Sequence, residues 1–149
     1  MQFSELPLHT SILKAVAEER FHTPTLVQQK TIPFVLKKKN VIVCAQTGTG
    51  KTAAFTLPII QLLLDKRDTE KREKKIKSLI LTPTRELAIQ ILENFISYTK
   101  YTDLSTTAVF GGVSLEPQKK ILANGADILI ATPGRLIDLQ IQGNIDLSS

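Results

Sequence analysis

Short apolar runs alternate with segments of helical periodicity along most of this chain, and this alternation constrains its fold more than any other feature. Strands that are buried on both faces of a parallel sheet are typically continuous apolar runs, and helices connect them. The expected strands are Val41–Ala45, Leu79–Leu81, Thr106–Phe110 and Ile128–Ala131. The expected helices are Ala53–Leu64, Glu86–Tyr98, Leu115–Leu122 and Leu136–Ile141. The pattern predicts an α/β domain, a parallel sheet with helices on both faces.

Two further helical segments precede the first expected strand. They cover Thr10–Glu19 and Thr25–Leu36, and no strand lies between them. A helical pair without a strand is an appendage to an α/β unit rather than part of its sheet. We therefore expect residues 1–29 to form an appendage and residues 30–149 to form the α/β domain.

Composition excludes several classes of protein. The 149 residues are 42% hydrophobic and 22% charged, which is typical of one folded globular domain. No apolar run approaches the ~18 residues that a membrane span needs, so we expect no membrane association. The N-terminus lacks the layout of a secretory signal, and the one cysteine cannot form a bridge within the chain. These features favour a cytoplasmic location, with Cys44 as a small core residue. His9 and His22 have no cysteine partner nearby, which argues against a zinc site.

The net charge of +5 is unevenly distributed. Residues 65–77 hold seven basic and four acidic side chains, and Lys37–Lys39 adds three positive charges. A run of mixed sign is most simply a solvated loop and helix end. Attraction of a polyanion is the alternative, and the charge alone does not decide between the two.

A glycine-rich segment follows the first expected strand and opens the next helix. It consists of Ala45, Gln46, Thr47, Gly48, Thr49, Gly50, Lys51 and Thr52. Glycines let such a loop curl so that its N–H groups face a phosphate, and the helix N-terminus adds partial positive charge. Lys51 can reach the β- and γ-phosphates, and the Thr52 hydroxyl can bind Mg²⁺. The general pattern opens with glycine where this chain has Ala45. The segment predicts a site for a nucleoside triphosphate.

A second pattern, Thr-Pro-x-Arg, follows two of the expected strands. The first copy is Thr82, Pro83, Thr84 and Arg85, and the second copy is Thr132, Pro133, Gly134 and Arg135. Threonine and proline suit the start of a helix, so each copy alone is most simply a cap. Parallel strands end at one edge, however, where ligands bind. Two arginine-bearing helix starts at that edge, with Gly111 and Gly112 after a third strand, favour an extended polyanion.

The appendage carries a third pattern, from Phe21 to Gln28. A glutamine amide can donate and accept, so it can bind the N6 and N7 edge of adenine, and an aromatic ring can stack on the base. From the residues alone, an exposed position on a helix is the stronger interpretation of Gln28.

These residues together resemble the N-terminal part of a DEAD-box ATP-dependent RNA helicase, with the bacterial RhlE type as the nearest likeness. Phe3 and residues 21–28 are similar to the family's Q motif, and residues 45–52 to its Walker A segment, including the alanine. Residues 83–88 resemble motif Ia, Gly111-Gly112 the GG motif and residues 132–135 motif Ib. The resemblance implies a RecA-like P-loop fold that ends before the strand carrying the DEAD motif.

The resemblance also implies roles for the matching residues. Phe21 would stack on adenine and Gln28 would bind its edge, which selects ATP. Lys51 and Thr52 would hold the phosphates and Mg²⁺ and serve catalysis. The residues at the sheet edge would contact the sugar-phosphate backbone of RNA, and a second RecA-like domain would be the partner within the full-length protein. Two positions depart from the family pattern, because Arg20 stands where glycine usually precedes the aromatic residue and Leu26 replaces a proline.

No Asp-Glu-Ala-Asp segment occurs among the 149 residues. Phosphoryl transfer needs an acid for Mg²⁺ and a group that orients water. We therefore expect negligible ATP hydrolysis by this chain itself, and an alternative function is a non-hydrolysing fragment that binds nucleotide or RNA. The missing strand predicts exposed sheet edges and self-association. An unrelated kinase or transport ATPase would explain the glycine-rich loop but neither Gln28 nor the two Thr-Pro-x-Arg segments.

Overall fold

The computed structural model describes residues 1–67 and 75–148. The chain divides into two compact units, one formed by Met1–Lys71 with Ser97–Asp103 and the other by Arg72–Ile96 with Leu104–Ser149. Most of the charged segment 65–77 lies outside the described residues, so its two interpretations stay open.

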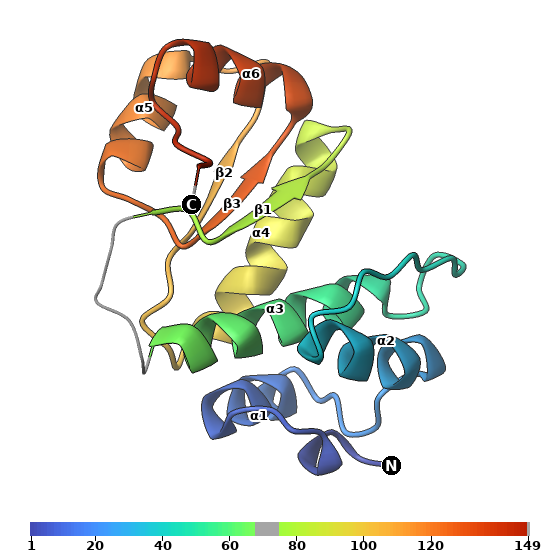
Figure 1. Cartoon of the computed structure of the whole chain (residues 1–149). Helices are drawn as coiled ribbons and strands as arrows, with labels where there is room; N and C mark the ends of the chain where they lie inside the picture. Colours follow the sequence, from blue (N-terminus) through green and yellow to red (C-terminus); the bar gives the residue numbers. More distant parts are fainter. Residues whose placement is uncertain (68–74, 149) are drawn as a thin grey trace. The chain divides into compact units, whose positions relative to one another are not determined.

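The first unit is helical. Its elements are a short 3-10 helix η1 (Phe3–Glu5), α1 (Thr10–Glu18), α2 (Leu26–Leu36) and α3 (Lys51–Arg67). Helix α2 packs along α3 (Figure 1). The fully buried side chains of this unit include Ile12, Ile32, Leu57 and Ile60, which come from all three α-helices. The two helices expected ahead of the glycine-rich loop are confirmed, and α3 begins two residues earlier than expected.

The strand expected at Val41–Ala45 is wrong. These residues form neither a helix nor a strand and pair with no strand among the described residues, and Ile42 is 95% exposed. An apolar run becomes a strand only when a neighbour satisfies its backbone N–H and C=O groups. Cys44 belongs to this run, and the prediction that it is a core residue is also wrong, because Cys44 is exposed.

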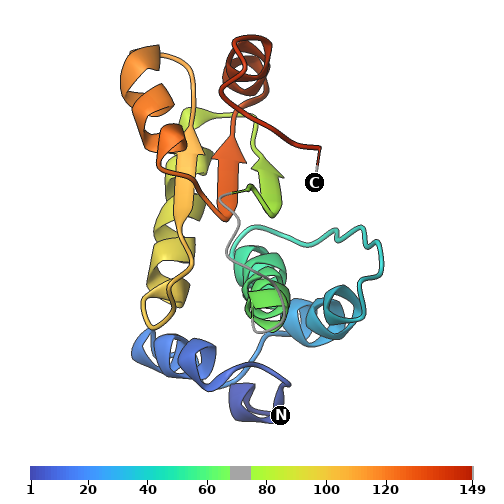
Figure 2. The same ribbon diagram turned by 60° about the vertical axis from the view of Figure 1, so that its left-hand side comes forward.

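The second unit contains a three-stranded parallel sheet. Its strands are β1 (Ser78–Leu81), β2 (Thr106–Val109) and β3 (Ile128–Ala131), in the order β1-β3-β2 (Figures 1 and 2). The register pairs Leu81 with Ala131 and Val109 with Ala131, so all three strands end level with one another. Every residue of the central strand β3 is buried, as expected for a strand covered on both faces.

Helices cover both faces of this sheet, as the sequence predicts. They are α4 (Arg85–Thr99), α5 (Leu115–Ala123) and α6 (Pro133–Ile141). On one face, Leu129 and Ala131 pack with Leu136 and Leu139 of α6. The alternate residues of β3, Ile128 and Ile130, are also fully buried, and α4 lies on that side of the sheet with Phe95 fully buried (Figures 1 and 2). The fold class is therefore confirmed.

None of the helices in residues 1–67 and 75–148 is both long and apolar enough to cross a bilayer.

Candidate nucleotide and nucleic-acid binding sites

The glycine-rich loop curls directly before α3. Gly48 and Gly50 have φ values of +84° and +86°, a region in which residues with a Cβ are strained. The Thr49 hydroxyl donates to the Gln46 carbonyl oxygen at 2.6 Å, and the Lys51 ammonium donates to the Ala45 carbonyl oxygen at 2.5 Å. The loop therefore brings Lys51 back to the start of the segment.

The first turn of α3 supplies the remaining groups of this site. The first N–H groups of any α-helix have no acceptor within the helix, and here those groups belong to Lys51 and its neighbours. Thr52 is half-buried in the same turn. Its hydroxyl is a hard oxygen donor, and Mg²⁺ commonly takes one or two protein oxygens, with phosphate and water oxygens completing an octahedron. The donor set of this loop therefore fits a Mg²⁺–phosphate group.

Gln28 lies against the same loop. Its side chain is only 4% exposed, its Nε2 donates to the Gly50 carbonyl oxygen at 3.2 Å, and its Oε1 accepts the Thr25 N–H at 2.9 Å. The interpretation of Gln28 as an exposed helical residue is therefore wrong. The sequence did carry a signal for the bond to Thr25, because Thr25 and Gln28 have the spacing of a capping box and form one at the start of α2.

The Gln28 amide keeps unused hydrogen-bonding capacity. A primary amide has two N–H donors and two acceptor lone pairs, and these two bonds use one of each. One donor and one acceptor remain, which is the pair that the N6 and N7 edge of adenine requires. Phe21, the predicted stacking residue, belongs to the same unit, and its ring is 42% exposed.

Arg20 has a left-handed backbone, with φ +62°. The Arg20 N–H donates to the Ala17 carbonyl oxygen and the Phe21 N–H donates to the Val16 carbonyl oxygen, the pattern of a Schellman motif that ends α1. Glycine is favoured at this position because it has no Cβ. Arg20 therefore departs from the family pattern in its side chain only, because its backbone keeps the left-handed conformation that glycine adopts easily.

The other predicted site residues follow the sheet. Residues 82–85, 110–113 and 132–135 come directly after β1, β2 and β3, and these strands end level with one another. Parallel strands present their carboxyl ends at one edge, so the three segments share that edge. The expectation that the two Thr-Pro-x-Arg segments and Gly111-Gly112 would meet there is confirmed at the level of the backbone.

The two Thr-Pro-x-Arg segments nevertheless start their helices differently. In the first, the Thr84 hydroxyl accepts the Leu87 N–H at 3.2 Å, and Thr82 is buried with its hydroxyl donating to the Thr84 carbonyl oxygen. In the second, Thr132 is the N-cap residue and Pro133 the first residue of α6.

The reason for this difference is the third residue of each segment. Thr84 has a hydroxyl that can cap a helix, whereas Gly134 has no side chain. Arg85 is consequently the first residue of its helix and exposed, while Arg135 is the third and half-buried. The expectation that each threonine caps its helix with proline at the first position is wrong for Thr82 and Pro83, because Thr84 caps α4 instead. Thr132 and Pro133 occupy the expected positions, although the Thr132 hydroxyl makes no capping hydrogen bond.

The glycine pair approaches residues of both helix starts. The Gly111 N–H donates to the Thr132 hydroxyl at 3.4 Å. Gly112 has φ +80°, and a Cβ added there would lie 3.4 Å from Nη1 of Arg85. The edge therefore brings together the glycine pair, Thr132 and the Arg85 guanidinium.

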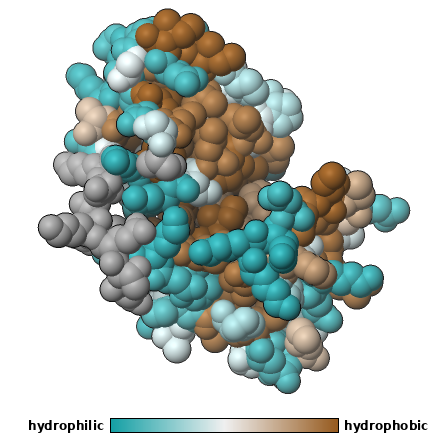
Figure 3. All heavy atoms as spheres, viewed as in Figure 1, coloured by the Kyte–Doolittle hydropathy of each residue, from teal (hydrophilic) through white to brown (hydrophobic). Residues whose placement is uncertain are grey.

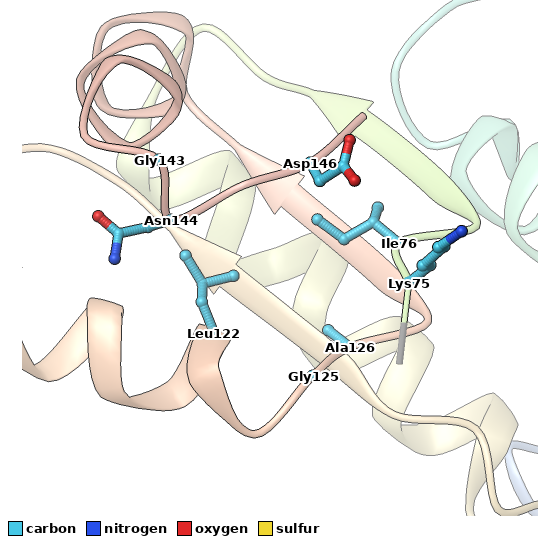
Figure 4. A pocket seen from close by; sticks show the side chains of 8 residues that line it. All are labelled: Lys75, Ile76, Leu122, Gly125, Ala126, Gly143, Asn144 and Asp146. Carbon is cyan, nitrogen blue, oxygen red and sulfur yellow. The ribbon is translucent and has the colours of Figure 1, made fainter. Parts of the chain in front are cut away.

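A cavity of about 210 Å³ lies at the opposite edge of the sheet (Figure 4). It is lined by residues that precede β1 and β3, such as Ile76 and Ala126, and by Asn144 and Asp146 after α6. Two hydrogen bonds from Ser148 and the nearby Lys75 ammonium lower the pKa of the Asp146 carboxyl. This cavity contains none of the site residues predicted from the sequence.

Comparison with known proteins identifies relatives along almost the whole chain. A family model described as DEAD/DEAH box helicase matches residues 25–148. An ATP-dependent RNA helicase dbp10 of Emericella nidulans is 42% identical over 147 residues, which cover 99% of this chain and 15% of the relative. The DEAD-box ATP-dependent RNA helicase RhpA of Helicobacter pylori is 46% identical over 136 residues, which cover 91% of this chain and 26% of the relative.

A solved structure of an RNA helicase also matches the fold of this chain. The crystal structure of a hypothetical ATP-dependent RNA helicase from Sulfolobus tokodaii superposes with a TM-score of 0.83 at 42% identity, covering 95% of this chain and 39% of the other. The chain thus spans only a minor part of the length of these relatives. The matching family model and the RecA-like fold of this relative lead to one conclusion: this chain belongs to the DEAD/DEAH box helicase family.

Proposed function

We propose that this chain is the ATP- and RNA-binding portion of an ATP-dependent RNA helicase that remodels RNA duplexes in the cytoplasm. The observation that carries the proposal is the buried Gln28 amide, which bonds to Gly50 of the glycine-rich loop and keeps one donor and one acceptor for a base. In this arrangement residues 1–29 are the appendage that supplies the base contacts, and residues 30–149 are part of the motor domain.

The nucleotide site takes its groups from one unit. Phe21 stacks on adenine and Gln28 binds its edge, and the N–H groups of residues 45–52 surround the phosphates. Lys51 donates to the β- and γ-phosphates, and Thr52 supplies an oxygen to Mg²⁺. The metal neutralises phosphate charge when it is bound.

The RNA site takes its groups from the other unit. The sugar-phosphate backbone lies along the carboxyl edge of the sheet, where two arginines and several helix N–H groups can donate to phosphate. The contacting residues are Pro83, Thr84, Arg85, Gly111, Gly112, Thr132, Pro133, Gly134 and Arg135. Such contacts carry no sequence code, so binding is independent of sequence. A second RecA-like domain completes the helicase in the full-length protein.

Thermal unfolding with Mg·ADP, with Mg·GDP and without nucleotide tests the nucleotide site. A ligand that binds only the folded state raises its stability, so ADP is expected to raise the Tm and GDP to leave it unchanged. Phe21→Ala should reduce the ADP shift, whereas Phe34→Ala, which removes another exposed ring of the same unit, should not. An equal shift with both nucleotides would refute base recognition by Phe21 and Gln28.

The 149-residue chain is expected to hold nucleotide without hydrolysing it, since it contains no acidic motif for Mg²⁺. Phosphate release measured with and without RNA distinguishes this from the helicase reaction. RNA-stimulated release by the purified chain would contradict the expectation.

We also propose that the chain self-associates through its unpaired backbone. Strand β1 pairs on one side only among the described residues, Leu81 is 56% exposed, and apolar side chains gather over this part of the sheet (Figure 3). Unpaired strand edges bind other edges readily. Sedimentation velocity should show a concentration-dependent increase in mass, and Leu81→Lys should reduce it. A monomer at every concentration would refute self-association.

A further inference from the structure

Gln118 belongs to none of the motifs singled out in the sequence, yet it is one of the few buried polar residues of its unit. It lies in α5 and is only 6% exposed. Its Nε2 donates to the Phe110 carbonyl oxygen at 3.1 Å, and its Oε1 accepts from Nη1 of Arg135 at 2.8 Å. One buried amide therefore joins the end of β2 to the guanidinium at the start of α6.

Arg135 also bonds directly to the loop that follows β2. Its Nη2 donates to the Val113 carbonyl oxygen at 2.9 Å. Phe110 and Val113 directly flank Gly111 and Gly112, so both ends of the glycine pair are tied to Arg135, one of them through Gln118. With the Gly111 bond to Thr132, three side chains hold this loop against the start of α6.

The amide suits this position because it is neutral. A guanidinium has five N–H donors, and the two bonds to Gln118 and Val113 leave three for another acceptor. A carboxylate at position 118 would pair with Arg135 and cancel its charge, and it would set an oxygen against the Phe110 carbonyl oxygen. Glutamine orients the guanidinium, donates to the carbonyl and leaves the positive charge available for an anion.

Arg85 differs in this respect. It is exposed at the first position of α4, and no ion pair holds it within residues 1–67 and 75–148. Of the two arginines at this edge, Arg135 is therefore held by hydrogen bonds and Arg85 is free among the described residues. Only Arg135 depends on a residue outside the sequence motifs, which is Gln118.

We propose that Gln118 is a positioning residue for phosphate recognition, which fixes Arg135 and the Gly111-Gly112 loop in the geometry that binds the RNA backbone. This proposal rests on the RNA-binding function proposed above. A preorganised donor set binds more tightly than a mobile one because less side-chain and loop entropy is lost on binding.

The first test measures binding of a labelled oligouridine by fluorescence anisotropy over a series of NaCl concentrations. Gln118→Glu is expected to weaken binding about tenfold and to reduce the slope of log K against log salt by about 0.7, the loss of one phosphate contact to a single strand. Gln118→Met keeps the charge of Arg135, so it should weaken binding but leave the slope unchanged.

Gln140→Glu is the matched control. Gln140 is an exposed residue of α6, so this variant makes the same change of charge without touching the network. Its affinity and slope should stay close to those of the unmodified chain. If Gln118→Glu and Gln140→Glu have the same effect, net charge alone explains the result and the positioning role is refuted.

A second measurement needs no RNA. In ¹⁵N NMR spectra of arginine side chains, hydrogen bonds slow rotation about the Nε–Cζ bond. The rotation is expected to be slow for Arg135 and fast for Arg85 in the unmodified chain, and fast for both in Gln118→Met. If the unmodified chain fails to bind oligouridine, the proposed RNA function is wrong, while slow rotation at Arg135 still supports positioning by Gln118. Equal rates at Arg85 and Arg135 in the unmodified chain would overturn the proposal even if no variant folds.

Discussion

Replacing Gly50 by alanine tests the contact between the base-reading glutamine and the glycine-rich loop. A Cβ at Gly50 would lie 2.4 Å from Nε2 of Gln28 and 3.1 Å from the Thr25 hydroxyl. Gly48 has almost the same φ, +84° against +86°, but a Cβ added there meets nothing within 4 Å. The pair Gly50→Ala and Gly48→Ala therefore shares the backbone strain and differs in the contact with α2.

The expected costs follow from these two terms. A left-handed backbone costs a residue with a Cβ about 1–2 kcal/mol, and this is the whole cost expected for Gly48→Ala. Gly50→Ala also displaces the Gln28 amide, which loses its bonds to Gly50 and Thr25 at about 1 kcal/mol each. We expect Gly50→Ala to lower the free energy of unfolding by about 3–4 kcal/mol in total.

Urea unfolding of single and double variants separates the two terms. Because Gln28→Ala removes the same two hydrogen bonds, it should add little to the effect of Gly50→Ala, whereas its effect should add fully to that of Gly48→Ala. Equal costs for the two glycine variants, or additive effects of Gly50→Ala and Gln28→Ala, would show that the contact contributes nothing to stability.

Three other predictions concern stability. Burial, with a smaller contribution from Glu19, raises the pKa of Tyr98 to about 12. A raised tyrosine pKa leaves stability intact below about pH 10 and lowers it as pH rises towards 12, so urea unfolding should show an alkaline loss of stability that is about 2 kcal/mol smaller in Tyr98→Phe. The buried Thr56 hydroxyl has no partner among the described residues, so Thr56→Val should raise the free energy of unfolding by about 1 kcal/mol, whereas Thr82→Val, which loses a hydrogen bond, should lower it. Arg20→Gly should stabilise the end of α1 by up to about 1 kcal/mol in thermal unfolding, and a lower Tm than that of Arg20→Ala would contradict the role of the left-handed backbone.

The elements that the sequence predicted correctly are those whose patterns are local. The apolar runs at Leu79–Leu81 and Ile128–Ala131 form strands because each finds a neighbour within the described chain. The run at Val41–Ala45 is similarly apolar but has no such neighbour among the described residues, and an apolar pattern does not show whether a partner strand is present. Strand formation at that position depends on tertiary pairing, which no local pattern contains.

The site shows the same division between local and tertiary information. The glycine-rich loop was found from its residues because the required φ values restrict the sequence directly. The burial of Gln28 and Gln118 was not found, since each amide reaches a carbonyl oxygen that is 22 or 8 residues away along the chain. A glutamine has the same appearance in a sequence whether its amide meets water or another segment.

The exposed thiol of Cys44 has a practical consequence. It is the single cysteine of the chain and stands directly before the glycine-rich loop. A maleimide dye would therefore attach at one known place without any engineered residue, and its fluorescence would report events at the neighbouring loop. The same accessibility allows a disulfide between two copies in air, so a reductant is required before any dimer is assigned to pairing of strands.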